Sequence, residues 1–261
     1  MINRRKLMLL LGGAISAPRA LCAQQRAVPE VGFLGISSAA LYEARLDALR
    51  QGLNEIGRVE GQNLTIEYRW AEGRYERLPA LAAELVGRKV DAIVATASPA
   101  ALAAKSATPR IPIVFVAVAD PVTAGLAASL ARPGGNITGI SVMAVELLPK
   151  RLELLCELVP RAKVIALLVN PNNYYTERII ADAHEAARAR NVALQILTAG
   201  VESEIDSAFN SLNQSGAGAL VVGADPFLAN RREQLVALAT RHAVPAISES
   251  REFVEAGGLI S

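Results

Sequence analysis

The segment Ile113–Val142 restricts the possible folds of this chain more than any other. It begins with an apolar run of strand length, Ile113–Ala119, which leads directly into Asp120-Pro121. Proline fits the first turn of a helix, where its missing N–H is not needed, so Asp120 is a candidate N-cap. In an open parallel sheet, such a loop lies at the carboxyl end of its strand, where ligands of doubly wound folds bind. We therefore predict a short helix with apolar positions at Val122, Leu126 and Leu130, ended by Pro133 and two glycines, and then a strand over Ile137–Val142.

The same junction returns twice in the second half of the chain. The apolar run Val164–Val169 ends in Asn-Pro-Asn-Asn, and the run Ala219–Val222 ends in Gly-Ala-Asp-Pro. One such junction is an ordinary turn between a strand and a helix. Because three of them are distributed over two halves, they predict two lobes that present strand ends to one cleft.

Strands and helices alternate along the chain, which predicts an α/β fold whose lobes each contain a parallel sheet with helices on both faces. We expect an N-terminal lobe at 28–142 and a C-terminal lobe at 143–261, joined by a short hinge. The expected strands are 31–36, 64–68, 90–95, 113–119, 137–142, 164–169, 192–197, 219–222, 244–247 and 259–261, and the expected helices are 46–56, 78–85, 100–106, 147–158, 177–189, 204–212 and 231–241.

The N-terminus has the layout of a secretory signal peptide. Basic residues at positions 4–6 precede a short apolar run, Leu7–Ala17, and Ala23 stands just before a polar Gln-Gln pair. The apolar run is much shorter than the roughly 20 residues that span a bilayer. We therefore predict a signal peptide at 1–23 and export to the periplasm by the Sec or the twin-arginine route.

The net charge gives no indication of a polyanionic partner, and the cysteine content gives none of a disulfide. Cleavage after Ala23 would remove four basic residues and no acidic ones, which would change the formal net charge from +2 to −2. A nearly neutral protein has no general attraction for nucleic acid, so we expect no nucleic-acid partner. Cys156 would then be the last cysteine, so no intramolecular disulfide is expected, and its leucine-rich surroundings favour a buried structural thiol.

Polar residues at strand ends of the first half are candidates for ligand contact. Ser37, Ser38 and Ser98 could donate hydrogen bonds to a ligand carboxylate beside helix N-termini, with Ala97 next to Ser98. Helix capping is the alternative role of these serines. Asp120, followed by Pro121, is placed to receive a ligand ammonium group, although an N-cap aspartate would have the same position.

The second half offers a matching set of candidates. Asn170, Asn172 and Asn173 follow a buried strand and could bind an amino acid, although turn formation alone would also explain them. Asp225 repeats the Asp-Pro motif, Phe227 could stack on an apolar part of a ligand, and Glu249 follows the next strand.

Four longer motifs resemble a known family. They are EGQNLTIEYRWAEG at Glu60–Gly73, DPVTAGLAASLARPGGNITGIS at Asp120–Ser141, KRLELLCELVP at Lys150–Pro160 and GADPF at Gly223–Phe227. Together they resemble the ABC-transporter substrate-binding protein family that includes tryptophan-binding members. The resemblance implies a type I periplasmic binding protein fold, in which two Rossmann-like lobes close on a small solute and a monomer hands it to an ABC permease in the inner membrane.

The resemblance also concerns the C-terminus. Family members usually continue past GGLIS with a helix, a strand and a return crossing into the first lobe, whereas this sequence stops at Ser261. We therefore expect that the return segment is missing.

Motifs of catalysis and metal binding are absent from the sequence. There is no G-x-S-x-G, no P-loop and no G-x-G-x-x-G after a strand, and His184 and His242 have no second ligand at metal spacing. We predict a noncatalytic protein without metal or cofactor that binds a small polar metabolite such as an amino acid. The alternatives are a ligand sensor, or an α/β enzyme that acts on a small carboxylate through Asp120 and Asp225.

Overall fold

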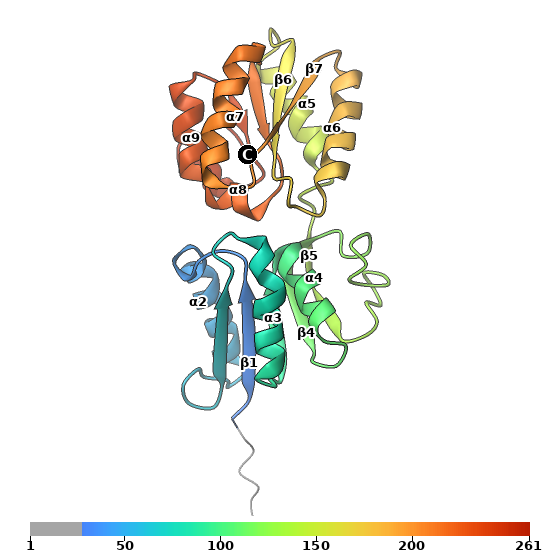
Figure 1. Cartoon of the computed structure of the whole chain (residues 1–261), viewed down its shortest axis with the longest axis vertical. Helices are drawn as coiled ribbons and strands as arrows, with labels where there is room; N and C mark the ends of the chain where they lie inside the picture. The colour runs from blue at the N-terminus through green and yellow to red at the C-terminus, as the bar shows by residue number, and fades with distance from the viewer. Residues whose placement is uncertain (1–27) are drawn as a thin grey trace, which may run out of the picture.

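The computed structural model describes residues 28–261, which form two α/β lobes stacked along the long axis of the molecule (Figure 1). We call them the N-lobe, built on strands β1–β5, and the C-lobe, built on strands β6–β9. The segment between β5 and the first helix of the C-lobe, residues 143–147, joins the two lobes. The predicted signal peptide lies outside the described residues.

The N-lobe contains a five-stranded parallel sheet in the order β2-β1-β3-β4-β5. Helices α3 and α4 pack side by side, and aromatic side chains of α2, β1 and β2 form a separate cluster. The elements are β1 (Glu30–Gly35), α2 (Ala39–Glu55), β2 (Thr65–Trp70), the 3-10 helix η1 (Tyr75–Arg77), α3 (Leu78–Gly87), β3 (Ala92–Thr96), α4 (Ala97–Ala107), β4 (Ile113–Ala119) and β5 (Ile137–Val142).

The C-lobe contains a four-stranded parallel sheet in the order β7-β6-β8-β9. Its helices cover the sheet on both sides in Figure 1. The elements are α5 (Leu148–Leu158), β6 (Val164–Val169), α6 (Thr176–Ala189), β7 (Ala193–Thr198), α7 (Glu202–Ser215), β8 (Ala219–Val222), α8 (Pro226–Asn230), α9 (Arg232–Arg241), β9 (Ala246–Ile247) and α10 (Arg251–Glu255).

The hydrophobic pattern explains why these elements pack as they do. The central strand β6 is an apolar run that is buried almost throughout, as expected for a parallel strand covered on both faces. Helix α6 buries Ile179, Ala183 and Ala187, which are spaced by four residues and therefore share one face. No helix within residues 28–261 has the length and apolar character needed to cross a membrane.

The helix predicted between β4 and β5 is wrong. Residues 121–136 form turns instead, and three glycines there, at 125, 134 and 135, have positive φ angles. Two carbonyls of this loop accept hydrogen bonds from a side chain of α4: Lys105 Nζ lies 2.5 Å from the oxygen of Gly125 and 3.2 Å from that of Leu126. These glycine conformations interrupt the helical repeat that the spacing of the leucines suggested.

Two predicted elements of the C-lobe differ from the structure. The helix expected at 231–241 is preceded by a separate short helix, α8, which begins after Asp225. The strand expected at 259–261 is reduced to one bridge between Ile260 and Ile247, which places it on β9 of the C-lobe.

Candidate functional site

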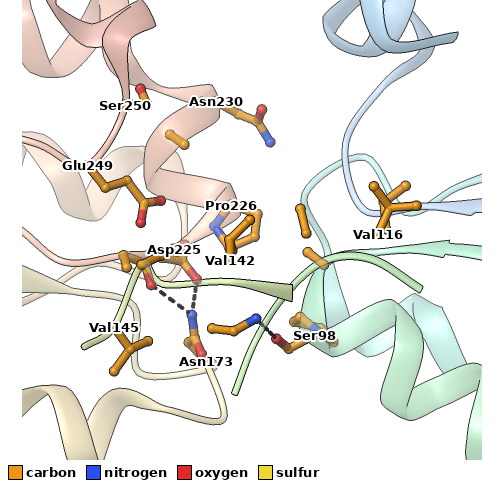
Figure 2. A pocket seen from close by; sticks show the side chains of 18 of the residues that line it. Ser98, Val116, Val142, Val145, Asn173, Asp225, Pro226, Asn230, Glu249 and Ser250 are labelled. Carbon is orange, nitrogen blue, oxygen red and sulfur yellow. Dashed lines mark hydrogen bonds between the residues drawn. The ribbon is translucent and has the colours of Figure 1, made fainter. Parts of the chain in front are cut away.

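A cavity of about 730 Å³ lies between the two lobes, where the parallel strands of both sheets end. The N-lobe contributes the ends of β3, β4 and β5, and the C-lobe contributes the segments that follow β8 and β9. Figure 2 shows side chains from both lobes pointing into this space. Its position agrees with the rule that ligands of open α/β sheets bind at the carboxyl ends of the strands.

The first turn of α4 forms the polar part of the N-lobe wall. Thr96 is the N-cap residue, but its hydroxyl donates to the carbonyl of Leu34 at 3.4 Å and does not cap the helix. Ser98 Oγ accepts a hydrogen bond from the N–H of Ala119 at 3.3 Å, across to β4 (Figure 2). No side chain caps α4, and Pro99 in its first turn has no N–H, so the N–H groups of Ala97 and Ser98 are the ones left to bind an anionic group of a ligand.

Two residues that line this wall have a strained backbone. Ala97 has a φ angle of 60° and Ala117 has a φ angle of 57°, which lie in the left-handed region that alanine rarely adopts. Ala117 coincides with a register shift in the pairing of β4 with β5. Such strain costs energy and concentrates at ligand sites, so its presence at two cavity positions favours a binding role for this wall.

Asp225 anchors the C-lobe wall and is fully engaged by protein donors. Its Oδ1 accepts from Asn170 Nδ2 at 3.2 Å and from the N–H of Leu228 at 3.0 Å. Its Oδ2 accepts from Asn173 Nδ2 at 2.8 Å and from the hydroxyl of Tyr75 at 2.9 Å. Burial raises the pKa of Asp225, and these hydrogen bonds oppose that effect.

Glu249 and Arg151 also line the cavity, but neither has its polar atoms fully paired. Glu249 Oε2 and Arg151 Nε are buried without a hydrogen-bond partner among the described residues. Arg151 donates instead through Nη2 to the carbonyl of Ala144 at 2.6 Å, in the segment that joins the lobes. Burial raises the pKa of Glu249 to about 7, although Arg151 has a lowering effect, and burial lowers the pKa of Arg151.

The N-lobe also contributes a set of apolar side chains to the cavity lining, which we call the apolar arm. Phe33 on β1 and Tyr42 on α2 lie here in an edge-to-face contact with ring centroids 6.2 Å apart. Leu49, Val94 and Val116 line the same arm. The arrangement combines a polar end between the lobes with an apolar extension, which suits a ligand that has a charged head and an apolar side chain.

Several contacts cross between the lobes. Arg178 on α6 pairs with Asp120 at 2.5 Å, and Arg45 on α2 pairs with Glu252 on α10 at 3.3 Å. Tyr75 adds its hydrogen bond to Asp225 from the N-lobe side. These contacts hold the two walls of the cavity together.

Five of the residues predicted to contact a ligand line the cavity. Ala97 and Ser98 come from the N-lobe, and Asn173, Asp225 and Glu249 come from the C-lobe. The structure therefore brings together candidates from sequence positions that lie far apart.

The other seven candidates do not line this cavity, and for most of them the structure shows contacts elsewhere. Ser37 Oγ accepts a hydrogen bond from Asn230, and Ser38 precedes α2 without a capping side-chain bond. Pro121 is buried, and its carbonyl accepts from the N–H groups of Leu126 and Ala127 in the loop.

Asp120 pairs with Arg178, and its Oδ1 accepts from the N–H of Thr123 at 3.0 Å, so the expected cap bond forms within a turn. Burial alone would raise the pKa of Asp120, but the bonds from these two residues lower it. Asn170 supports Asp225, whereas Asn172 is exposed beside a second groove on α3 and α4. The side chain of Phe227 is buried in the C-lobe core.

Sequence reasoning missed other residues of the cavity, including Arg151, Tyr175 and Asn230. A signal for Arg151 exists, because it lies on the same helical face as Leu148, Leu152 and Leu155, where a charged side chain is unusual. Within residues 28–261, no group of three or more His, Cys, Asp or Glu side chains is arranged to hold a metal ion.

Comparison with known proteins identifies a family and a curated relative that match most of the chain. The model of the family described as ABC transporter substrate binding protein matches residues 33–261. A tyrosine-binding protein of Clostridioides difficile (strain R20291) is 30% identical over 231 residues, which cover 87% of this chain and 66% of that protein. The chain thus spans about two thirds of the length of this curated relative.

Two crystal structures have closely similar folds. A conserved domain protein of Vibrio cholerae has a TM-score of 0.80 and 29% identity, with 89% of this chain and 77% of that chain covered. The ABC domain from Streptococcus pneumonia, solved in complex with L-Trp, has a TM-score of 0.77 and 24% identity, with 89% and 79% covered. The leucine binding protein LivK of Thermotoga maritima is similar in fold, with a TM-score of 0.64, 13% identity and 88% and 67% covered. The type I periplasmic binding protein fold implied by the sequence motifs is therefore confirmed.

Proposed function

The chain belongs to the family of ABC transporter substrate-binding proteins, and from this premise we propose that it binds an amino acid in the cavity between its lobes. We further propose that the protein works as an extracytoplasmic monomer and delivers the solute to an ABC permease. The predicted signal peptide supports this location, since its basic and apolar regions occur in the order that export requires.

The observation that carries the proposal is the composition of the cavity. Free N–H groups at the start of α4, next to Ser98, suit the carboxylate of an amino acid. The opposite wall presents the carboxylate of Glu249, whose Oε2 has no hydrogen-bond partner among the described residues, next to Asp225. An amino acid carries an ammonium group and a carboxylate on the same α-carbon, so it can bridge the two walls and stabilise the closed arrangement of the lobes.

The apolar arm favours amino acids with an aromatic side chain. Phe33 and Tyr42 line the cavity, and aromatic rings pack favourably against one another, so an aromatic ligand side chain would find matching neighbours there. The names of two similar proteins point the same way, since one relative is a tyrosine-binding protein and one structure contains L-Trp. We therefore propose tyrosine and tryptophan as the first ligands to test.

A thermal-shift screen of the purified mature protein against amino acids, organic acids and sugars tests the proposal. We expect aromatic amino acids to raise the melting temperature, because a ligand at a hundredfold excess over its Kd stabilises the native state by about 2.7 kcal/mol. Titration calorimetry would then give the affinity. Stabilisation by sugars alone, or by no amino acid, would contradict the proposal.

The same samples address the catalytic alternative. An enzyme that used Asp120 and Asp225 would need both carboxylates at the ligand, whereas Asp120 is paired with Arg178 outside the cavity. We therefore propose binding without turnover. Mass spectrometry of the ligand after long incubation would detect a product if this proposal is wrong.

A further inference from the structure

The two carboxylates of the C-lobe wall differ in what they can offer a ligand. Asp225 accepts four hydrogen bonds, from Asn170, Leu228, Asn173 and Tyr75. An ionised carboxylate has about four lone-pair positions, so these donors occupy all of them. The charge of Asp225 is therefore used to hold the wall together, and it has no free position for a ligand group.

Glu249 has the opposite arrangement. Its Oε2 is buried without a hydrogen-bond partner among the described residues, and its side chain lines the cavity. Figure 2 shows the carboxylate of Glu249 pointing toward the same space as that of Asp225. A buried acceptor without a donor is costly, so a donor from a ligand at this position would bind favourably.

The charges around Glu249 favour a cation. Arg45 and Glu252, which also line the cavity, pair with each other, and Arg251 pairs with Glu255 on α10. The unpaired charges of the lining are then one guanidinium, that of Arg151, and two carboxylates, those of Asp225 and Glu249. One positive group on a ligand would balance this excess of negative charge.

We propose that Glu249, and not Asp225, receives the ammonium group of the bound amino acid, and that Asp225 positions the wall through its four donors. This inference rests on the proposed function and assigns the residue that distinguishes an amino acid from a plain carboxylate. It also couples ligand binding to the ionisation of Glu249, since only the carboxylate form attracts an ammonium group.

Three groups act on that ionisation from the elements around Glu249. Arg151 on α5 favours the charged form, whereas Asp225 before α8 and Glu252 on α10 oppose it. Burial is the largest cause, and together with Asp225 and Glu252 it raises the pKa of Glu249 to about 7 against the lowering effect of Arg151. Raising the pH through this value ionises Glu249, so the affinity for an amino acid should increase as the pH rises toward neutrality.

Calorimetric titration with two matched pairs of probes tests the proposal. The pairs are L-tyrosine with 3-(4-hydroxyphenyl)propanoate and L-tryptophan with indole-3-propanoate, in which the second compound lacks the ammonium group. In Glu249→Gln we expect the amino acids to bind at least about tenfold more weakly, because a charged hydrogen bond is lost. The affinity of Glu249→Gln for the propanoates should stay within about threefold of the wild-type affinity, since these compounds have no ammonium group to contact the carboxylate of Glu249.

Further variants and the pH profile separate a ligand contact from a structural role. Glu255→Gln makes the same chemical change on the exposed surface of α10 and should bind all probes as wild type does. Asp225→Asn should weaken the binding of each amino acid and of its matching propanoate to the same extent, because it disturbs the wall and not the ammonium contact. Between about pH 5.5 and about pH 7.5, wild-type affinity for the amino acids should rise roughly tenfold, whereas Glu249→Gln should show a flat profile.

The outcomes distinguish this inference from the proposed function. Equal amino-acid binding by wild type and Glu249→Gln would overturn the inference alone. Selective loss of amino-acid binding in Asp225→Asn would assign the ammonium contact to Asp225 and would also overturn it. Failure of wild type to bind either amino acid would overturn the proposed function and this inference with it.

Discussion

Asp225 and Glu249 show how a residue's neighbours decide what its charge can do. Both were predicted as ligand residues because they follow strand ends, and both line the cavity. Sequence could place them at one edge of the sheet, since the carboxyl ends of parallel strands lie together. It could not show that Asp225 is saturated by donors from Asn170, Asn173 and Tyr75, because Tyr75 lies on the other lobe.

Glu249 should make the stability of the protein depend on pH. Its pKa is raised from an ordinary value of 4.5 to about 7 in the folded state. Between these values the native state holds a proton that the unfolded state releases, so the free energy of unfolding falls as the pH rises. The stability that the protonated form of Glu249 allows is fully present below about pH 4.5, and it is lost as the pH rises through about 7.

The measurement compares wild type and Glu249→Gln by urea unfolding from pH 4.5 to 8. The two should be similarly stable at the acid end, and the variant should be more stable at the alkaline end by up to about 3 kcal/mol, because a tenfold change in proton affinity corresponds to about 1.4 kcal/mol. Asp225 is present in both proteins, so the part of its contribution that does not depend on Glu249 cancels, whereas its repulsion of the Glu249 carboxylate belongs to the difference. A stability difference that does not change with pH would contradict the raised pKa.

At the scale of elements, strand positions were more predictable than the segments between strands. The strands at Ile113–Ala119, Val164–Val169 and Ala219–Val222 have the bounds expected from their apolar runs. A buried parallel strand is a nearly continuous apolar run, which makes its ends easy to recognise. The loop after β4 was mistaken for a helix because its leucines have helical spacing, whereas its glycines adopt positive φ angles.

The pairing of β4 with β5 depends on the absence of a side chain at Gly139. A Cβ atom there would lie 2.0 Å from the carbonyl oxygen of Phe115, its partner on β4. Gly139→Ala should therefore lower the free energy of unfolding by about 1–3 kcal/mol, because the strands must move apart. Chemical denaturation of the purified variant measures this change.

Gly52 offers a matched control for this prediction. It lies inside α2, and a Cβ atom at that position would meet nothing within 4 Å. Gly52→Ala should stabilise the protein by about 0.5–1 kcal/mol, because alanine favours the helix more than glycine does. If both variants were neutral, the close approach of β4 and β5 would not be a constraint on the sheet.

At the scale of the whole molecule, function depends on how the lobes meet. The alternation of strands and helices predicted two lobes with strand ends facing one cleft, but it could not identify the pairs that cross it. Arg178 and Asp120 are 58 positions apart, and Arg45 and Glu252 are 207 apart. Such pairs arise from the orientation of one lobe against the other, which has no local signal in the sequence.

The ion pair between Arg178 and Asp120 should favour the closed arrangement of the lobes. Arg178 lies on α6 of the C-lobe, and Asp120 follows β4 of the N-lobe. Both side chains are partly exposed, so the pair should contribute about 1 kcal/mol or less. Asp120→Asn and Arg178→Gln should each weaken binding of L-tyrosine by about twofold to fivefold, because part of the binding energy must then close the lobes.

A double-mutant cycle separates this contribution from direct effects on the ligand. The double variant Asp120→Asn/Arg178→Gln should bind no more weakly than either single variant, since the pair is already broken. Asp182→Asn removes a second carboxylate near Arg178, 3.7 Å away on the same helix, and should leave binding unchanged. Small-angle X-ray scattering without ligand should give a larger radius of gyration for the three pair variants than for Asp182→Asn. Additive losses of affinity, together with unchanged scattering, would mean that this contact does not control closure.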